Sequence, residues 1–330
     1  MAIVQKKPAM AQSKPDASIV IPTYNAGPGF EKVLDAISNQ RSDFTYEILV
    51  VDSGSSDGTP QLARESSARV LDVHRSEFNH GGTRNLGISE SRGEFVAMIV
   101  QDAVPADGLW LQGLVENLAN DEKVAGVYSR QIPRPGCNPF TRHGLENHFT
   151  NLPERREQAI EDLALYEALP PPQKLKLVTF DDVSSCIRRS VWEKHPFRRL
   201  SFGEDIEWSE RVMKAGYKVV YDPRSVVIHS HDRSAFYEMK RAYVAHKLLG
   251  ELLGFRALPT FRDFRTRLPG LIRHRWRLAQ ADGGGRRLYA QAIMRSMGDQ
   301  AGVFLGGVAG SRPGRDRIPR FVDRYLSRGV

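Results

Sequence analysis

The sequence is poor in cysteine and in long hydrophobic runs. Its 330 residues include two cysteines, Cys137 and Cys186, which form no CxxC motif. Both are expected to be free thiols, which fits a protein of the reducing cytoplasm better than a secreted protein stabilised by disulfide bonds. No apolar run approaches the roughly 20 residues that a membrane-spanning helix needs. Residues 1–18 lack the apolar segment of a signal peptide. We therefore expect a cytoplasmic protein whose residues 1–16 form a disordered tail.

Acidic residues are scarce near the end of the chain. Residues 240–330 hold 19 Lys and Arg against 6 Asp and Glu, whereas the remainder holds 28 against 33. A basic C-terminal third on an acidic body suggests a polyanionic neighbour, either a membrane surface or a nucleic acid. Six arginines between Arg262 and Arg277 surround apolar residues such as Trp276, as in helices that lie on anionic membranes. The alternative is that the helices of this C-terminal third pack on the rest of the protein or mediate dimerisation.

The first part of the chain alternates between apolar segments and segments with helical periodicity. Strands are expected at 17–21, 47–51, 69–73, 95–100 and 124–128, with helices between them. This alternation predicts parallel strands joined by right-handed crossovers.

The remainder is less regular. A charged helix is expected near 154–168, a strand over 178–187 and a helix over 204–215. Short strands are expected at 218–221 and 225–228, and basic helices follow from 235.

Two acidic residues follow directly on predicted strands. Asp52 comes after the strand 47–51, and Asp102 comes after the strand 95–100. The carboxyl ends of parallel strands are where open α/β sheets bind ligands. Mg²⁺ or Mn²⁺, held by one or two carboxylates and substrate phosphates, would suit Asp102. For Asp52, contact with a nucleotide and capping of the next turn are equal alternatives.

Further polar groups extend this site. Glu204 and Asp205 open a predicted helix, where acids complement the helix dipole but one could also act as a general base. His229 and His231 share one face of a predicted strand, so one of them could bind a metal or serve a structural role. The segment His80-Gly81-Gly82-Thr83-Arg84-Asn85 suits a diphosphate at a helix start, or simply caps that helix.

Taken in chain order, these segments resemble the family 2 glycosyltransferases with the GT-A fold. The resemblance rests on Ser18-Ile19-Val20-Ile21-Pro22-Thr23-Tyr24-Asn25, Val50-Val51-Asp52-Ser53-Gly54-Ser55-Ser56-Asp57-Gly58-Thr59, the Asp102 loop, Gly203-Glu204-Asp205-Ile206-Glu207-Trp208 and Ala215-Gly216-Tyr217. It covers about residues 17–232. Within the family, Phe78-Asn79-His80-Gly81-Gly82-Thr83-Arg84-Asn85, Gln101-Asp102-Ala103 and His229-Ser230-His231 look like bacterial rhamnosyltransferases.

The resemblance implies an α/β fold, with a Rossmann-like mixed sheet flanked by helices and a C-terminal basic helical extension. The expected catalytic domain is 17–234, with a nucleotide-sugar half at 17–130 and an acceptor and catalytic half at 131–234. The extension, 235–330, would serve membrane-surface binding or dimerisation.

The resemblance also implies roles for single residues. The nucleotide pocket would be lined by Pro22, Thr23, Tyr24, Asn25, Asp52, Ser53 and Arg84. Asp102, with His229 or His231, would bind Mg²⁺ or Mn²⁺, and Asp205 would be the catalytic base. The donor sugar or acceptor would be contacted by Asp181, Asp182, Ser184, Ser185, Glu204 and Trp208.

Two positions depart from the family pattern. The family often carries a second acid after Asp52, where this chain has Ser53, which weakens the expectation of base recognition. The DxD-type position reads Gln101-Asp102-Ala103, with one carboxylate. Metal binding would therefore rely on the diphosphate, water and a histidine as well.

The expected activity is inverting, metal-dependent transfer of a sugar from a nucleotide diphosphate. The favoured donor is dTDP-L-rhamnose, and the favoured acceptor is a cell-surface glycan or lipid-linked glycan at the inner face of the cell membrane. A UDP- or GDP-linked donor is the alternative. A sugar nucleotidyltransferase would need a Gly-rich basic loop where this chain has Pro22-Thr23-Tyr24-Asn25. A non-catalytic protein that binds nucleic acid through its basic third is the alternative from another class.

Overall fold

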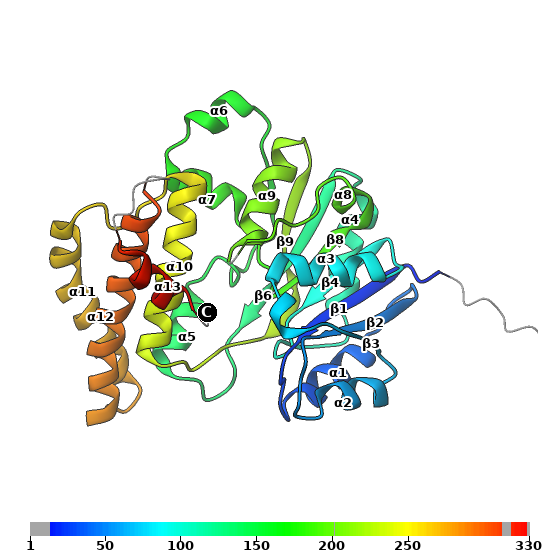
Figure 1. The fold of residues 1–330 in the computed structure, drawn as a ribbon, viewed down its shortest axis with the longest axis horizontal. Helices are drawn as coiled ribbons and strands as arrows, with labels where there is room; N and C mark the ends of the chain where they lie inside the picture. The colour runs from blue at the N-terminus through cyan, green and yellow to red at the C-terminus, as the bar shows by residue number, and fades with distance from the viewer. Residues whose placement is uncertain (1–13, 201, 312–317, 329–330) are drawn as a thin grey trace, which may run out of the picture.

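The computed structural model describes residues 14–200, 202–311 and 318–328, so most of the predicted tail lies outside the described residues. Figure 1 shows a twisted sheet with helices on both faces, and beside it a group of helices formed by the C-terminal part of the chain. The expected α/β class with a C-terminal helical region is confirmed.

The first half of the sheet is parallel, as the alternation predicted. Its strands are β1 (Ala17–Thr23), β2 (Tyr46–Asp52), β3 (Arg69–Asp72) and β4 (Phe95–Ile99), in the order β3-β2-β1-β4. The connections contain α1 (Phe30–Ser38), α2 (Thr59–Glu65), the 3₁₀ turn η1 (Arg75–Glu77) and α3 (His80–Glu90). This arrangement brings the carboxyl ends of β1, β2 and β4 to one edge of the sheet.

The second half of the sheet is mixed. After β5 (Val104–Pro105) and α4 (Trp110–Asn120), the strand β6 (Val124–Ile132) pairs with β8 (Ser184–Arg188), which runs antiparallel between β4 and β6. The strand β9 (Lys218–Ile228) lies parallel to β6 and antiparallel to β5 and β7 (Arg156–Ala159). The helices here are α5 (Pro139–Glu146), α6 (Leu163–Ala168), α7 (Pro171–Val178), α8 (Arg189–Trp192) and α9 (Glu204–Lys214).

Three element predictions in this half were wrong. The charged helix near 154–168 is a strand and a short helix, because residues 156–159 pair with β9 and Asp162 caps α6 by accepting a hydrogen bond from Leu165. The strand expected over 178–187 begins only at Ser184. The two short strands at 218–228 are one strand, whose pairing with β6 shifts in register between Ser129 and Arg130.

Side chains on successive strand positions enter two separate cores, as strand geometry requires. On β1, Ile19 and Ile21 pack with α1 and α4, whereas Val20 packs on the opposite face with Ile88 of α3 and Trp208 of α9. Both faces of the sheet are therefore covered, and polar groups for a ligand are left to the loops at its edge.

The C-terminal region is helical, with α10 (Ala235–Leu253), α11 (Phe261–Ala281), α12 (Arg286–Ala309) and α13 (Arg320–Ser327). Four glycines spaced four residues apart let α12 approach α10 closely: Gly298, Gly302, Gly306 and Gly310. A Cβ at Gly298 would lie 2.9 Å from the carbonyl oxygen of Ala235, and at the other three it would lie closer still to carbonyls of α10. In the described part of the chain, no helix is long and apolar enough to cross a bilayer.

Candidate active site

Asp102, His229 and His231 meet beyond the ends of β4 and β9. The Nε2 atom of His231 lies 3.3 Å from Asp102 Oδ2, and that of His229 lies 3.7 Å from Asp102 Oδ1. The two Nε2 atoms are 3.1 Å apart. One carboxylate and two imidazoles thus place their ligand atoms within 4.8 Å of one another, which fits a single divalent cation.

The surroundings of this cluster favour metal-binding imidazoles. Burial lowers the pKa of His229 to about 4 and also lowers the pKa of His231, so both rings are neutral near pH 7. The Nδ1 atom of His229 lies 3.0 Å from Gln131 Oε1, an acceptor that holds the proton on Nδ1 and leaves Nε2 free to bind a metal. Gln131 was not predicted, because only the pairing of β6 with β9 brings it beside His229.

Asp205 lies in a group of carboxylates at the start of α9. Its Oδ2 accepts a hydrogen bond of 3.4 Å from the backbone N–H of Asp182. Burial raises the pKa of Asp205 well above its ordinary value, and the negative charges of Glu204, Asp182 and Asp181 raise it further. A carboxylate with a raised pKa is a stronger base near neutral pH, as proton abstraction requires.

Arg84 pairs with this acidic group. Its buried guanidinium forms an ion pair with Glu204, and its Nε lies 3.4 Å from Asp182 Oδ2. Burial raises the pKa of Asp182 to about 6, although Arg84 opposes this shift. Arg84 is therefore an internal counter-ion of the acidic group, and its contact with a nucleotide diphosphate stays a prediction.

The loops after β1 and β2 are tied together by Asp52. Its Oδ1 accepts hydrogen bonds from the hydroxyls of Thr23 and Ser55, at 2.8 and 2.6 Å, and its Oδ2 accepts from the N–H groups of Gly54 and Ser55. These four bonds use the acceptor positions of a carboxylate. Of the two alternatives for Asp52, the structure shows the turn cap.

The other residues predicted for the nucleotide pocket lie beside Asp52. Pro22 pairs with Val51, and the N–H of Ser53 donates to the carbonyl of Thr23. Asn25 has a φ of 44° and accepts a hydrogen bond from the N–H of Ser56. The ring of Tyr24 lies under the guanidinium of Arg75, with 4.3 Å from its Cζ to the ring centroid.

Gln101 connects these loops to the metal-ligand cluster. Its side chain accepts a hydrogen bond of 2.7 Å from the N–H of Tyr24 and donates one of 3.2 Å to the carbonyl of the same residue. Residue 102 is therefore held at a fixed position relative to the end of β1.

The residues predicted to contact substrate include three buried Trp and Ser side chains: Trp208, Ser184 and Ser185. Trp208 is 0% exposed, and its indole N–H donates to the carbonyl of His195, so it cannot stack on an acceptor. Ser184 is buried beneath Trp110, whose indole N–H donates to its hydroxyl. Its neighbour Ser185 points to the opposite face of β8, where its hydroxyl donates to Asp182. Ser185 supports the acidic group from a buried position.

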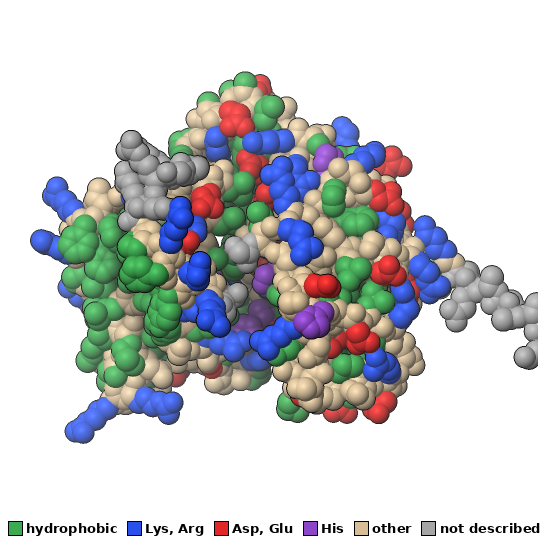
Figure 2. Space-filling view, viewed as in Figure 1, with side chains coloured by type: hydrophobic (Ala, Val, Ile, Leu, Met, Phe, Trp, Pro, Cys, Tyr) green, Lys and Arg blue, Asp and Glu red, His purple; other side chains and the backbone are tan. Residues whose placement is uncertain are grey.

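The cluster opens into a cavity of about 450 Å³ between the sheet and the C-terminal helices. Asp181, Val183, His229 and His231 line it on the sheet side, and residues of α5 and α10 line it on the other. Figure 2 shows histidine side chains at the floor of the hollow between the two parts of the molecule.

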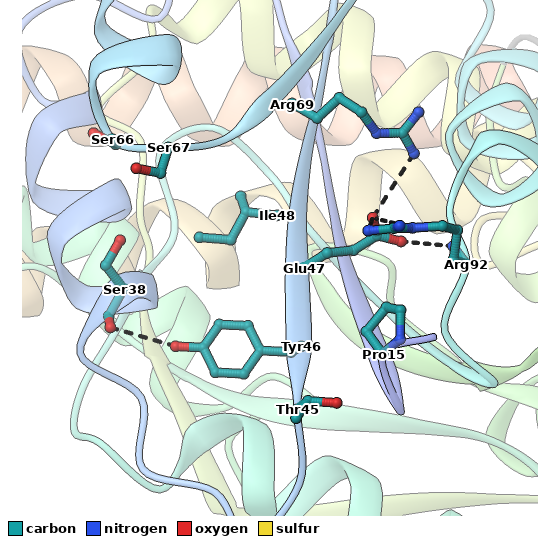
Figure 3. A pocket seen from close by; sticks show the side chains of 10 residues that line it. All are labelled: Pro15, Ser38, Thr45, Tyr46, Glu47, Ile48, Ser66, Ser67, Arg69 and Arg92. Atoms are coloured by element: carbon teal, nitrogen blue, oxygen red, sulfur yellow. Dashed lines mark hydrogen bonds and ion pairs between the residues drawn. The ribbon is translucent and has the colours of Figure 1, made fainter. Parts of the chain in front are cut away.

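Another hollow, of about 920 Å³, lies at the opposite end of β2 (Figure 3). Its charged groups are already paired. Glu47 accepts hydrogen bonds from Arg92 and Ser18 and lies 3.9 Å from Arg69. It contains none of the metal-ligand or general-base candidates, so we place the active site at the Asp102 cluster.

Comparison with known proteins agrees with this fold and site. The sequence model of glycosyl transferase family 2 matches residues 18–187. The O-antigen chain rhamnosyltransferase RfbN of Salmonella typhimurium is 32% identical over 232 residues, 68% of this chain and 70% of that protein. The O-antigen chain rhamnosyltransferase WbaN of Salmonella anatum is 30% identical over 235 residues, 69% of this chain and 70% of that protein.

Solved structures share the fold. The mannosyltransferase PcManGT of Pyrobaculum calidifontis, in complex with GDP-Man and Mn²⁺, has a TM-score of 0.51 at 20% identity and covers 89% of this chain and 73% of its own. Glucosyl-3-phosphoglycerate synthase of Mycobacterium tuberculosis, with Mn²⁺, UDP and its product, also has a TM-score of 0.51, at 18% identity, covering 76% of this chain and 87% of its own.

The mixed sheet and the polar edge define a GT-A glycosyltransferase, an enzyme with a nucleotide-sugar donor. Within that class, the chain belongs to glycosyl transferase family 2, and it is similar to bacterial rhamnosyltransferases of that family. The predicted family is confirmed.

Proposed function

We propose that the protein transfers L-rhamnose, with inversion, from dTDP-L-rhamnose to a hydroxyl of a cell-surface glycan or a lipid-linked glycan. Two relatives that match about two thirds of the chain are named rhamnosyltransferases of the O-antigen chain, and this supports both the sugar and the glycan acceptor. The family match favours this enzyme over the alternative of a non-catalytic nucleic-acid-binding protein.

Asp205 would act as the general base in this reaction. It would accept the proton of the acceptor hydroxyl as that oxygen attacks the anomeric carbon. The observation that carries this role is the raised pKa of a carboxyl group at the edge of the sheet where β1, β2 and β4 end. Asp182, Glu204 and Arg84 would hold Asp205 in place, because their hydrogen bonds and ion pairs surround the start of α9.

Asp102, His229 and His231 would hold Mg²⁺ or Mn²⁺. Such an ion supplies positive charge that stabilises a departing diphosphate. The chain's own contribution is to keep the two imidazoles neutral and correctly oriented, through burial and through Gln131. Pro22, Thr23, Tyr24, Asn25 and Ser53 would border the nucleotide, in loops ordered by Asp52.

We also propose that residues 17–234 form the catalytic domain and that residues 235–330 hold it against an anionic membrane at the cytoplasmic face. The exposed side chains of Phe261, Trp276, Ile293, Met294 and Met297 on α11 and α12 support this. Figure 2 shows hydrophobic side chains over these helices, with Lys and Arg at the margins. A basic margin around an apolar face fits an anionic lipid surface.

The donor is tested by incubating the pure protein with Mn²⁺ and dTDP-L-rhamnose, or with UDP- or GDP-linked sugars, and measuring the slow release of nucleoside diphosphate. Release from dTDP-L-rhamnose alone, or at least tenfold faster than from the others, is expected. Faster release from another donor would mean that the protein transfers the sugar of that donor and not rhamnose. No release from any donor would contradict the proposed function.

The base is tested with Asp205→Asn. Loss of a general base costs about 10²- to 10⁴-fold in rate, and the amide keeps the size of the side chain, so nucleotide binding should remain within about threefold by calorimetry. Asp162→Asn, at the cap of α6, is the matched control and should retain the wild-type rate. A wild-type rate in Asp205→Asn would remove Asp205 from the mechanism.

A further inference from the structure

The cavity beside the metal-ligand cluster is built largely by residues outside the sheet. Its far wall consists of residues of α5, one residue of α11, two residues of α12 and one face of α10, namely Glu238, Arg241, Ala242, Ala245 and His246. None of the loop residues after β1 or β2 lines it. Its lining is therefore distinct from the loops that would border the nucleotide.

The wall of this cavity is polar but carries no net charge. Its acids are Asp181, Glu238 and Asp299, and its arginines are Arg241, Arg275 and Arg295. Burial lowers the pKa values of the lining histidines His148 and His246, so these two rings are neutral near pH 7. A balanced wall of this kind offers hydrogen-bond donors and acceptors without attracting a polyanion.

Several polar atoms in this wall have no partner among the described residues. Arg275 and Asp299 form an ion pair, yet Arg275 Nη1 and Asp299 Oδ1 are buried without a hydrogen bond. The Nδ1 atom of His246 is also buried without a hydrogen bond. Buried polar atoms in proteins usually have a partner, which can be a water molecule or a ligand.

Apolar side chains complete the lining. Phe140 and Leu145 of α5, with Ala242 and Ala245 of α10, supply hydrocarbon surface beside the polar groups. A saccharide has the matching chemistry, because its ring presents C–H groups on its faces and hydroxyls around its rim. The volume, about 450 Å³, lies within the range of roughly 300–1,000 Å³ typical of small-ligand pockets.

We propose that this cavity binds the acceptor through an uncharged sugar unit, and that α10 and α5 select that unit. The inference rests on the proposed glycosyltransferase function and adds to it that the acceptor unit is uncharged and which residues recognise it. An acceptor sugar there would lie between Asp181 and the Asp102 cluster on one side and the C-terminal helices on the other.

The probes are the methyl glycosides of glucose, galactose, mannose and N-acetylglucosamine as neutral sugars, with glucuronic acid and glucose 1-phosphate as charged ones. Each is added at about 10 mM, roughly tenfold above a weak Kd of 1 mM, to protein, Mn²⁺ and the preferred donor. At least one neutral glycoside should raise diphosphate release severalfold above donor hydrolysis. If none does, or if only the charged sugars do, the proposal is wrong.

Ala245→Trp fills the cavity from α10. The stimulation by the neutral glycoside, relative to the same variant's rate without it, should fall at least tenfold. Glu251→Trp adds the same side chain at an exposed position of α10 outside the cavity and should keep the wild-type stimulation. Equal stimulation in both variants would overturn the proposal.

If Ala245→Trp is poorly folded by circular dichroism, Ala245→Leu fills less space and is expected to lose at least threefold of the stimulation. Unchanged stimulation in Ala245→Leu would then overturn the proposal. Donor hydrolysis by the wild-type protein distinguishes failure of the acceptor-cavity proposal from failure of the proposed function. Hydrolysis without stimulation contradicts only the acceptor cavity, whereas absence of hydrolysis with every donor contradicts the proposed function itself.

Discussion

Asp205, the proposed base, has a pKa that is raised by burial and by its neighbours. An isolated aspartate has a pKa of about 3.9 and would be a weak base at neutral pH. Here burial and three nearby carboxyl groups raise the pKa, while Arg84 neutralises part of the charge through Glu204 and Asp182. The cluster thus keeps a base of raised pKa without leaving every buried acid unpaired.

This arrangement predicts the pH dependence of the reaction. A general base works when deprotonated, so kcat/KM should rise with pH through the raised pKa of Asp205, well above pH 4. Asp181→Asn removes one of the negative charges that raise this pKa, and it can keep the hydrogen bond from Val183. Its acid limb should therefore move to lower pH. An unchanged profile would show that another group controls this limb.

The metal ligands predict a binding defect that can be measured without turnover. EDTA should abolish donor hydrolysis, and Mn²⁺ should restore it. Gln131→Leu leaves all three ligands in place but removes the partner of His229 Nδ1. Loss of such a partner weakens metal binding by about 10- to 100-fold, which calorimetry with Mn²⁺ would detect. Wild-type affinity in Gln131→Leu would mean that His229 needs no such partner.

Sequence motifs indicated the candidate metal ligands, which the structure brings together, and the acidic helix, but they did not reveal the partners of some residues. Asp102, His229 and His231 were predictable because each follows or ends a recognisable strand. The pairing of Arg84 with Glu204 joins residues 120 positions apart, and nothing local in the sequence indicates it. Trp208 was assigned to a substrate because its burial depends on packing against Phe180 and Phe197 across the sheet face.

The contact between α10 and α12 determines where one wall of the acceptor cavity stands. The glycines of α12 bring the two helices together, and α10 also packs against the start of α9. Gly203, with a φ of 70°, is the residue before that helix, and a Cβ there would overlap Leu248 of α10. The position of α10 is therefore linked to the acidic helix as well as to the cavity.

Gly302→Ala should disturb this contact. The added methyl would collide with the backbone carbonyl of Met239, and overpacking of this kind costs about 1–3 kcal/mol. Gly270→Ala on α11 is the matched control, because a Cβ there meets nothing within 4 Å and alanine favours the helix by up to about 1 kcal/mol. Thermal unfolding should show a lower Tm for the first variant only. Equal Tm values would mean that the helices can separate without loss.

The parallel strands were predictable from local periodicity, whereas the mixed half of the sheet was not. The strand β8 inserts antiparallel between β4 and β6, and this order depends on contacts between segments about 60 to 90 residues apart. The division of 154–168 into β7 and α6 likewise depends on the free edge of β9, which the sequence of that segment does not reveal.

The whole chain combines a catalytic sheet with a basic, partly apolar surface. The protein should therefore sediment with vesicles containing phosphatidylglycerol at low salt and much less at 0.5 M salt, since salt screens charges within a few ångströms. Met297→Glu places an acid on the exposed apolar face of α12, where the side chain of Met297 is 52% exposed, and should weaken binding severalfold.

Leu165→Glu is the matched control, because Leu165 is 68% exposed on α6, away from the C-terminal helices, and should bind as the wild type does. Equal weakening in both variants would indicate a nonspecific charge effect and would contradict docking through α12. Both measurements are made on the full chain.

The two histidines stand at the point where β9 ends and the chain runs, within six residues, into α10. The same short segment thus carries two candidate metal ligands at one end and leads into α10 at the other. A tilt of α10, for instance on contact with lipid, would therefore shift His231. Manganese resonance spectra recorded with and without vesicles would reveal such mechanical coupling directly.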